Sequence, residues 1–163
     1  MTSKSLQTLA CLAALALGVQ TIHAQSQDRQ GNNVMEHAQI QSTIEANNAA
    51  VSAGDIEGAL AAFEPNAAMV AQPGVTVTGT EALRGAFQQF LAINPKITAT
   101  GHDIVQAGDI ALCSFTWKMA GKAPDGSAIE QSGFSVAVLR KQADGRWLMV
   151  IDNPFGDLLL RRN

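Results

Sequence analysis

The spacing of apolar side chains changes once along this chain, and that change constrains the fold more than any other sequence feature. Before Pro95, apolar residues recur at steps of three and four, which is typical of amphipathic helices. After Pro95 they alternate with polar residues over 97–106, 109–121, 129–141 and 146–153, which predicts four strands. Short turn sequences join these strands, so neighbours are expected to be antiparallel. Helices followed by strands predict an α+β domain, with helices packed on one face of a curved antiparallel sheet.

Three helices and a short strand are expected before this change. The first helix is expected to begin at Asn33, which can cap it, and to end at Gly54. A short second helix capped by Asp55, a strand over 67–72 and a third helix capped by Thr80 should follow. One face of the first helix is expected to contain His37, Ile40, Ile44, Asn47 and Val51, with His37 partly exposed near the helix start.

The first 24 residues have the layout of a secretory signal peptide. Lys4 precedes an apolar run from Leu6 to Val19, and Ala24 supplies a small residue before a cleavage site. This run is shorter than the roughly 20 apolar residues that span a bilayer, so no membrane anchor is expected after cleavage of 1–24. We therefore expect a periplasmic or secreted mature protein that begins with a flexible, Gln-rich and Asn-rich leader over 25–33.

Charge and motif content exclude several functional classes. The chain has 11 Lys and Arg against 14 Asp and Glu, which argues against a polybasic nucleic-acid binder. No group of His, Cys, Asp and Glu has the spacing of metal ligands, and no glycine-rich phosphate loop or nucleophile elbow is present. Cys113, in the centre of a strand, is expected to be buried and inert. The sequence therefore predicts neither a cofactor nor a metal site.

The order of elements and four local motifs resemble the nuclear transport factor 2-like superfamily, in particular its SnoaL-like and ketosteroid-isomerase-like branch. The resemblance covers residues 34–157 and leaves a short tail over 158–163. It implies a cone-shaped fold in which the sheet wraps on the three helices around an apolar pocket, and a homodimer formed through the outer sheet face. The motifs are Ala53–Gly58, Gln72–Gly74, Gly79–Arg84 and Gly145–Asn153.

The same resemblance argues against steroid-isomerase chemistry. The carboxylate base of those enzymes falls near Ala71 or Gln72, neither of which can take a proton from carbon at neutral pH. Their tyrosine donor falls at Asn47, and this chain contains no Tyr. Their second acidic donor falls near Ser135. A member with a different role is therefore expected.

Strand alternation and isolated polar residues predict the lining of the pocket. Phe115 and Trp117 share one bulky apolar face of their strand, which should point toward the helices. Asn47 interrupts an apolar stripe, so its amide must meet either a ligand or an internal partner. Gln72 ends a strand beside a turn and could donate to a ligand carbonyl. The expected ligand-binding residues are Asn47, Gln72, Phe115, Trp117 and Ser135.

Asp152 is the candidate catalytic acid. It follows Leu148 and Val150 on one face of the last strand, and the family comparison turns that face toward the pocket. Desolvation there would raise its pKa and allow it to act as a general acid or base. The competing interpretation is an Asp held by backbone donors near Pro154–Gly156.

Three functions remain open on this sequence. The first is binding of a small apolar or amphipathic molecule, which calls for a cavity of roughly 300 Å³ or more. The second is a lyase, isomerase or hydrolase in which Asp152 is the acid or base, which requires Asp152 to face that cavity beside a polar group. The third is an interaction module that uses the outer face of the sheet.

Overall fold

The computed structural model describes residue 31 and residues 33–161, with side chains as far as Leu158. The expected signal peptide over 1–24 lies outside the described residues. The first helix covers residues 33–53. The other elements are α2 (Ile56–Leu60), β1 (Phe63–Gln72), β2 (Val75–Thr78), α3 (Thr80–Leu91), β3 (Lys96–Ala107), β4 (Ile110–Lys122), β5 (Ala128–Lys141), β6 (Trp147–Asn153) and the 3-10 helix η1 (Gly156–Arg161).

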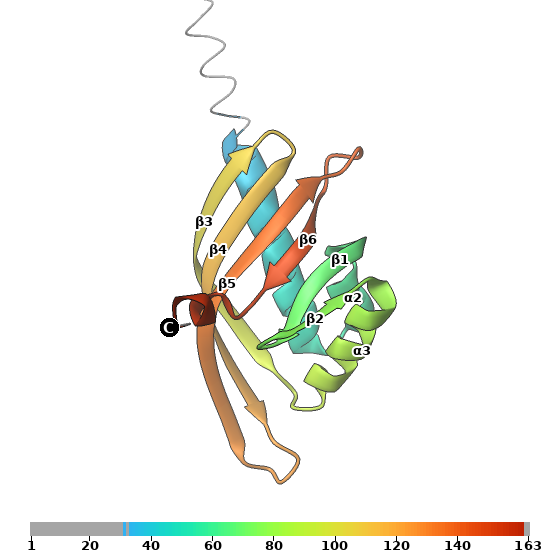
Figure 1. Ribbon diagram of the computed structural model, residues 1–163, viewed down its shortest axis with the longest axis vertical. Helices are drawn as coiled ribbons and strands as arrows, with labels where there is room; N and C mark the ends of the chain where they lie inside the picture. The colour runs from blue at the N-terminus through green and yellow to red at the C-terminus, as the bar shows by residue number, and fades with distance from the viewer. Residues whose placement is uncertain (1–30, 32, 162–163) are drawn as a thin grey trace, which may run out of the picture. The chain divides into compact units, whose positions relative to one another are not determined.

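The six strands form one sheet in the order β2-β1-β6-β5-β4-β3 (Figure 1). Neighbouring strands are antiparallel, as expected, except that β1 and β6 are parallel. The sheet is therefore mixed. The sequence could not indicate this pair, because turn chemistry constrains only strands that are joined by a short connection.

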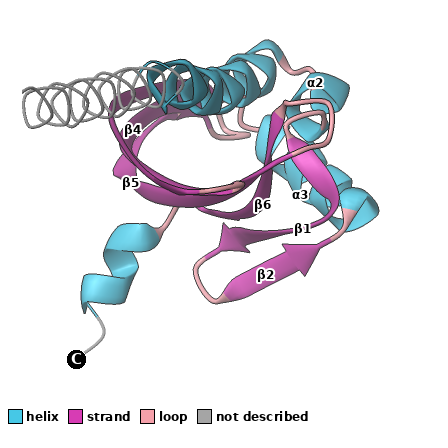
Figure 2. Cartoon of the chain, turned by 90° about the horizontal axis from the view of Figure 1, so that it is seen from above, coloured by secondary structure: helices cyan, strands magenta, loops and turns pink. Residues whose placement is uncertain are grey.

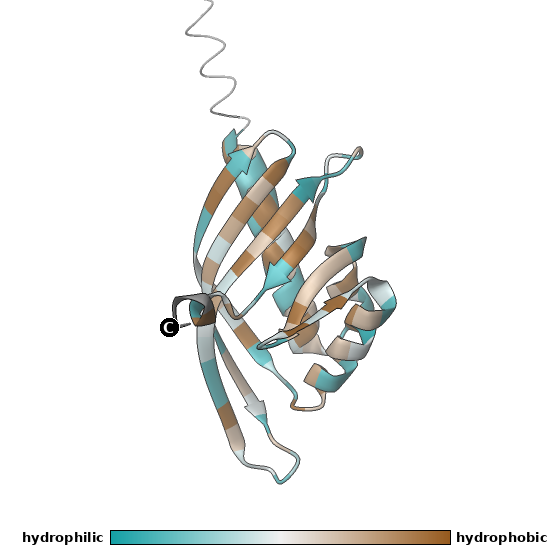
Figure 3. Cartoon of the chain, in the orientation of Figure 1, coloured by the Kyte–Doolittle hydropathy of each residue, from teal (hydrophilic) through white to brown (hydrophobic). Residues whose placement is uncertain are grey.

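The α+β architecture is confirmed. Within residues 38–163 the sheet curves, and the first helix lies along its concave side (Figure 2). The expected stripe of this helix is buried at Ile40, Ile44, Asn47 and Val51. Apolar and polar residues alternate along the long strands (Figure 3), and the face of β4 that carries Phe115 is the buried one. None of the described helices is long and apolar enough to cross a membrane.

The strands before α3 differ most from expectation. β1 begins at Phe63, four residues earlier than predicted, and Pro65 lies inside it instead of ending α2. β1 then pairs with β2 through a hairpin that the Pro73-Gly74 turn closes. The alternation of Val and Thr over 75–78 is typical of a strand and is the local pattern that indicates β2.

Two of the three expected N-terminal caps also differ. Asp55 caps α2 as expected, because its carboxylate accepts a hydrogen bond from the Gly58 amide at 2.9 Å. The first helix already includes Asn33, so Asn33 does not cap it. α3 begins after Gly79, and the Thr80 hydroxyl donates instead to the carbonyl of Pro65 at 3.3 Å. This bond ties the start of α3 to β1.

Candidate functional site

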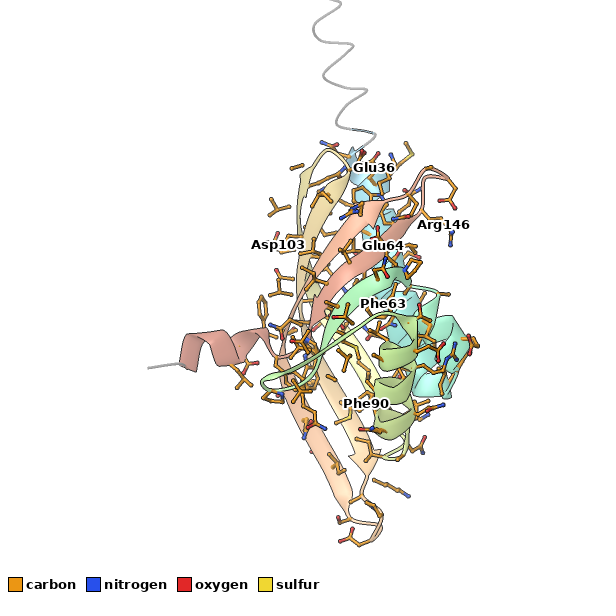
Figure 4. All side chains as sticks on the ribbon, turned by 45° about the vertical axis from the view of Figure 1, so that its right-hand side comes forward. Glu36, Phe63, Glu64, Phe90, Asp103 and Arg146 are labelled. Atoms are coloured by element: carbon orange, nitrogen blue, oxygen red, sulfur yellow. The ribbon has the colours of Figure 1, made fainter. Side chains whose placement is uncertain are left out.

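A cavity of about 140 Å³ lies between the first helix, α3, β1 and the inner face of β4, β5 and β6. Phe90 extends from α3 towards the sheet at this site (Figure 4). The cavity is smaller than the 300 Å³ that the binding hypothesis called for. It is lined by Ile44, Asn47, Asn48, Val51, Met69, Val70, Ala71, Ala86, Phe87, Phe90, Ile97, Phe115, Trp117, Met119, Gln131, Ser135, Met149, Asp152, Pro154 and Phe155.

Asp152 lies in this cavity, although not for the reason that the alternation suggested. Met149 pairs with Leu139 and Ile151 pairs with Val138, so Val150 is an extra residue in β6. This β-bulge reverses the alternation beyond it. Asp152 therefore shares the inner face with Met149, whereas Leu148 does not line the cavity.

The carboxylate of Asp152 meets one polar side chain across the sheet. The Ser135 hydroxyl on β5 donates to Oδ1 of Asp152 at 3.3 Å, and Ser135 itself is fully buried. The competing interpretation was that backbone donors near Pro154 hold Asp152. In the structure the neighbouring Asn153 has that role, because its Oδ1 accepts from the Phe155 amide at 3.0 Å.

Burial controls the protonation of this acid. Desolvation raises the pKa of Asp152 to about 6, and the hydrogen bond from Ser135 opposes that rise. Desolvation has the larger effect, because the water around the carboxyl group is replaced mainly by apolar side chains and by only one hydroxyl group. Asp152 therefore exchanges a proton close to neutral pH and can act as a carboxylate or as a neutral donor.

Trp117 forms one wall of the cavity and anchors the segment after β6. Its indole Nε1 donates to the carbonyl of Pro154 at 2.8 Å. This bond holds Pro154 and Phe155 against the cavity, which both residues line. The expected position of Trp117 is therefore reproduced, and its N–H is bonded to the protein.

Two adjacent asparagines of the first helix differ in what their amides meet. Nδ2 of Asn47 donates to the carbonyl of Ala59 at 2.9 Å, so this amide joins the first helix to α2. Nδ2 of Asn48 is buried at the cavity and has no hydrogen-bond partner among the described residues. A buried amide without a partner is costly, so Asn48 is the better candidate to donate to a ligand.

The structure brings together five of the six residues predicted for the site. Asn47, Phe115, Trp117, Ser135 and Asp152 line the cavity. Gln72 does not. It is exposed at the end of β1, where it pairs with Val75 in the hairpin, and the cavity is reached instead by its neighbour Ala71.

For three of the cavity residues, the sequence contains little or no indication that they line the site. Asn48 follows Ile44 by four residues and fits the helical spacing, so the stripe could have included it. Pro154 and Phe155 follow the end of the last strand, where neither periodicity applies. The position of Pro154 and Phe155 depends on the hydrogen bond from Trp117 to the Pro154 carbonyl, and these two residues are far apart in the sequence.

The remaining titratable side chains do not suggest metal or thiol chemistry. Among the described residues, no group of three or more His, Cys, Asp or Glu could hold a metal ion. Cys113 is fully buried on β4. Burial, with a smaller contribution from the charge of Asp103, raises the pKa of its thiol to about 11. The Cys113 thiol is therefore a poor nucleophile.

Comparisons with known proteins agree with this architecture. The family model of the SnoaL-like domain matches residues 44–149, which is more than half of the chain. No curated protein sequence matches the chain.

Solved structures with the same fold share few residues with this chain. A ketosteroid isomerase-like protein from Erwinia carotovora atroseptica is 16% identical with a TM-score of 0.63, covering 71% of this chain and 92% of that one. A protein of the NTF2-like family from Streptomyces avermitilis is 17% identical with a TM-score of 0.66, covering 73% and 94%. A protein with a cystatin-like fold from Nostoc punctiforme is 19% identical with a TM-score of 0.62, covering 72% and 87%. These similarities concern the fold alone.

Proposed function

The chain belongs to the SnoaL-like domain family, and from this premise we propose that its cavity binds a small amphipathic molecule. The observation that carries the proposal is the pair formed by Asp152 and Ser135 in a cavity whose lining is otherwise mostly apolar. A few placed polar groups fix the orientation of a ligand, while apolar walls supply most of the contact area. The fold supports either a ligand-binding or an enzymatic domain and does not choose between them.

The volume of the cavity sets the size of the molecule. An engineered apolar cavity of about 150 Å³ holds one benzene molecule. A cavity of about 140 Å³ therefore accommodates one ring or a short branched chain. A polar substituent on that ring can reach Asp152, whereas a four-ring steroid would remain largely outside.

Native mass spectrometry and thermal shift test this proposal. We expect a small molecule to co-purify with the protein and to raise its melting temperature when added back. Trp117→Ala removes a cavity wall and should abolish that shift. Phe134→Ala is the matched control, because Phe134 is an exposed aromatic residue on β5 that does not line the cavity. An equal shift in both variants would contradict binding at this site.

A second function, acid–base catalysis of the lyase, isomerase or hydrolase type, is favoured by the chemistry of Asp152. A carboxyl group with a pKa of about 6 can both take and return a proton near neutral pH. The unpartnered Nδ2 of Asn48 offers a hydrogen bond to a carbonyl oxygen that gains charge in such a step.

Hydrogen exchange at carbon tests this second function. Small ring ketones in deuterated buffer should incorporate deuterium next to the carbonyl faster with the wild-type protein than without it, and Asp152→Asn should remove the acceleration. Asp109→Asn, which makes the same substitution in an exposed turn, serves as the control. Equal rates with wild type and Asp152→Asn would exclude Asp152 as the base for these ketones.

We also propose that the outer face of the sheet forms a homodimer. Val105, Leu112, Val138 and Ile151 are register partners in one row across β3, β4, β5 and β6. Val105 is 63% exposed, Leu112 41% and Ile151 46%. An apolar row of this kind, in which three of the four side chains are exposed and Val138 is partly buried, is typical of an interaction surface.

Light scattering tests the dimer. We expect twice the chain mass for the wild-type protein and a single chain mass for Leu112→Lys, while Lys118→Ala should leave the mass unchanged. A monomeric wild-type protein would instead favour an interaction module that binds another protein through this face.

Export of the protein remains part of the proposal, and its support is the layout of residues 1–24. Fractionation of producing cells followed by intact mass measurement tests it. We expect the extracytoplasmic protein to lack residues 1–24, and a full-length cytoplasmic protein would contradict export.

A further inference from the structure

The aromatic residues of this chain are concentrated in its cavity. The chain has eight Phe and Trp residues, and five of them line the site. Three of its five Met residues, Met69, Met119 and Met149, line it as well. The five aromatic residues are Phe87, Phe90, Phe115, Trp117 and Phe155.

The charge of the cavity is unbalanced. Among the described residues that line it, Asp152 is the only one with a titratable side chain, and none is Lys, Arg or His. The neighbours of Asp152 in the sheet are Ala137 on β5 and Met69 on β1, which carry no charge. The bond from Ser135, at 3.3 Å, is a long one for two oxygen atoms. The carboxylate thus lies in an apolar site without a counterion among the described lining residues, and the imidazole of His102 lies outside this lining, 5.3 Å from the Phe115 ring.

A positively charged ligand would supply a counterion for Asp152 and could also interact with the aromatic rings of the cavity. A carboxylate is stabilised by an opposite charge within hydrogen-bond distance, most strongly where water is excluded. The faces of Phe and Trp rings are negative and attract ammonium groups, and aromatic cages of this kind recognise quaternary ammonium ligands. A neutral ligand of the same shape would gain neither interaction.

We propose that the cavity selects small organic cations, namely single-ring or short-chain amines and quaternary ammonium compounds, which place their positive charge at Asp152 among the aromatic side chains. This inference rests on the proposed function, because it names the chemical class of ligand for the same cavity. The volume of about 140 Å³ limits the apolar part to one ring. The raised pKa of Asp152, which burial causes, agrees with the lack of a counterion among the described lining residues.

Isothermal titration calorimetry with four probes that share a single benzene ring tests the inference. The probes are benzyltrimethylammonium, benzylammonium, benzyl alcohol and benzoate. At pH 7.5 we expect both cations to bind at least about tenfold more tightly than benzyl alcohol, and benzoate to bind most weakly. At pH 5 the advantage of the cations should shrink severalfold, because Asp152 then holds a proton and loses its charge.

Variants separate the charge from the aromatic walls. Asp152→Asn should reduce the cation preference to about twofold or less while benzyl alcohol still binds. Asp109→Asn is the matched control, because it removes the same charge from an exposed turn and should keep the preference. Phe90→Leu keeps an apolar wall without a ring and should weaken the cations more than benzyl alcohol.

The possible results distinguish this inference from the function on which it rests. If all four probes bind with equal affinity, the selection of cations is wrong and binding of small molecules stands. The same conclusion holds if the cation preference persists in Asp152→Asn. If none of the probes binds and no small molecule co-purifies, the proposed function fails and this inference fails with it.

Discussion

Trp117 lies directly over Gly133, its register partner on the neighbouring strand β5. A methyl group on Gly133 would lie 2.7 Å from Cζ2, 2.9 Å from Cε2 and 3.1 Å from Nε1 of the indole. The absence of a side chain at Gly133 therefore lets the indole cross β5 and reach the carbonyl of Pro154. Gly133 is a positioning residue for the cavity wall.

The Gly133→Ala variant should displace this wall. The methyl group and the indole cannot both keep their places, so we expect a loss of about 1–3 kcal/mol in the free energy of unfolding and weaker ligand binding. Urea denaturation and a ligand titration measure the two effects. Gly85→Ala is the control, because Gly85 lies in α3 with open space around it. This control should stabilise the protein by roughly 0.5–1 kcal/mol. Equal stability of both variants would contradict the account of Trp117.

Asp152→Asn should stabilise the protein at neutral pH. The folded protein holds the Asp152 proton up to a pH of about 6, whereas the ordinary value is 3.8. Between these values the folded state keeps a proton that the unfolded state has lost, so stability decreases as the pH rises through this window. Above pH 6 the full loss of folding free energy caused by the charged Asp152 is present, and it amounts to at most about 3 kcal/mol.

Thermal unfolding of both proteins from pH 4 to pH 8 checks this prediction. The difference in melting temperature between Asp152→Asn and wild type should be largest near pH 8 and vanish toward pH 4. A difference that does not vary with pH would show that Asp152 has no raised pKa in the folded state.

The two adjacent asparagines should respond differently to replacement by Ala. Asn47→Ala removes the bond to the Ala59 carbonyl, which then keeps only the 3.3 Å bond from the Ala62 amide, and it leaves a small cavity, so we expect a loss of about 1–2 kcal/mol. Asn48→Ala removes a buried amide that has no partner, so its effect on stability should stay within about 1 kcal/mol while ligand binding weakens. Denaturation curves and titrations of both variants measure this contrast. Reversed effects would show that Asn48 has the structural role.

Cys113 should resist alkylation in the folded protein. Its pKa of about 11 leaves little thiolate at pH 8, and its side chain is fully buried. We expect modification of the peptide that contains Cys113 to be at least about 100-fold slower than that of a free thiol. The rate should become that of a free thiol in urea. Rapid modification of the native protein would mean that this part of β4 opens to solvent.

Most of the fold could be predicted from the sequence, because the patterns that identify its elements are local. Alternation around Phe115 identified the buried face of β4, and Asp55 marked the start of α2, since each depends on nearby residues. The pairing of β1 with β6 was not predictable in this way. It joins Met69 to Asp152 across most of the domain, and no local pattern carries that information.

The candidate site was only partly predictable for the same reason. Asp152 was correctly predicted to face the cavity, but Leu148 and Val150 were wrongly assigned to the same face of the strand. The β-bulge at Val150 interrupts the alternation, and no characteristic residue type marks such a bulge in the sequence. Gln72 was assigned to the cavity because the turn after it was recognised and the hairpin was not. Asn47 and Asn48 could be distinguished only by their partners, which lie on other elements or are absent from the described part of the chain.

The extra residue Val150 holds the last strand in a frustrated arrangement. A regular strand of the same composition would turn Ile151 inward and Asp152 to water, which the hydrophobic effect alone would favour. The observed register does the reverse, leaving Ile151 46% exposed while a carboxylate is inside. A conflict of this kind between the local sequence preference and the observed structure is typical of functional sites, where stability is not the only requirement. The bulge at Val150 thus places the carboxyl group of Asp152 in the cavity and leaves Ile151 on the outer face of the sheet.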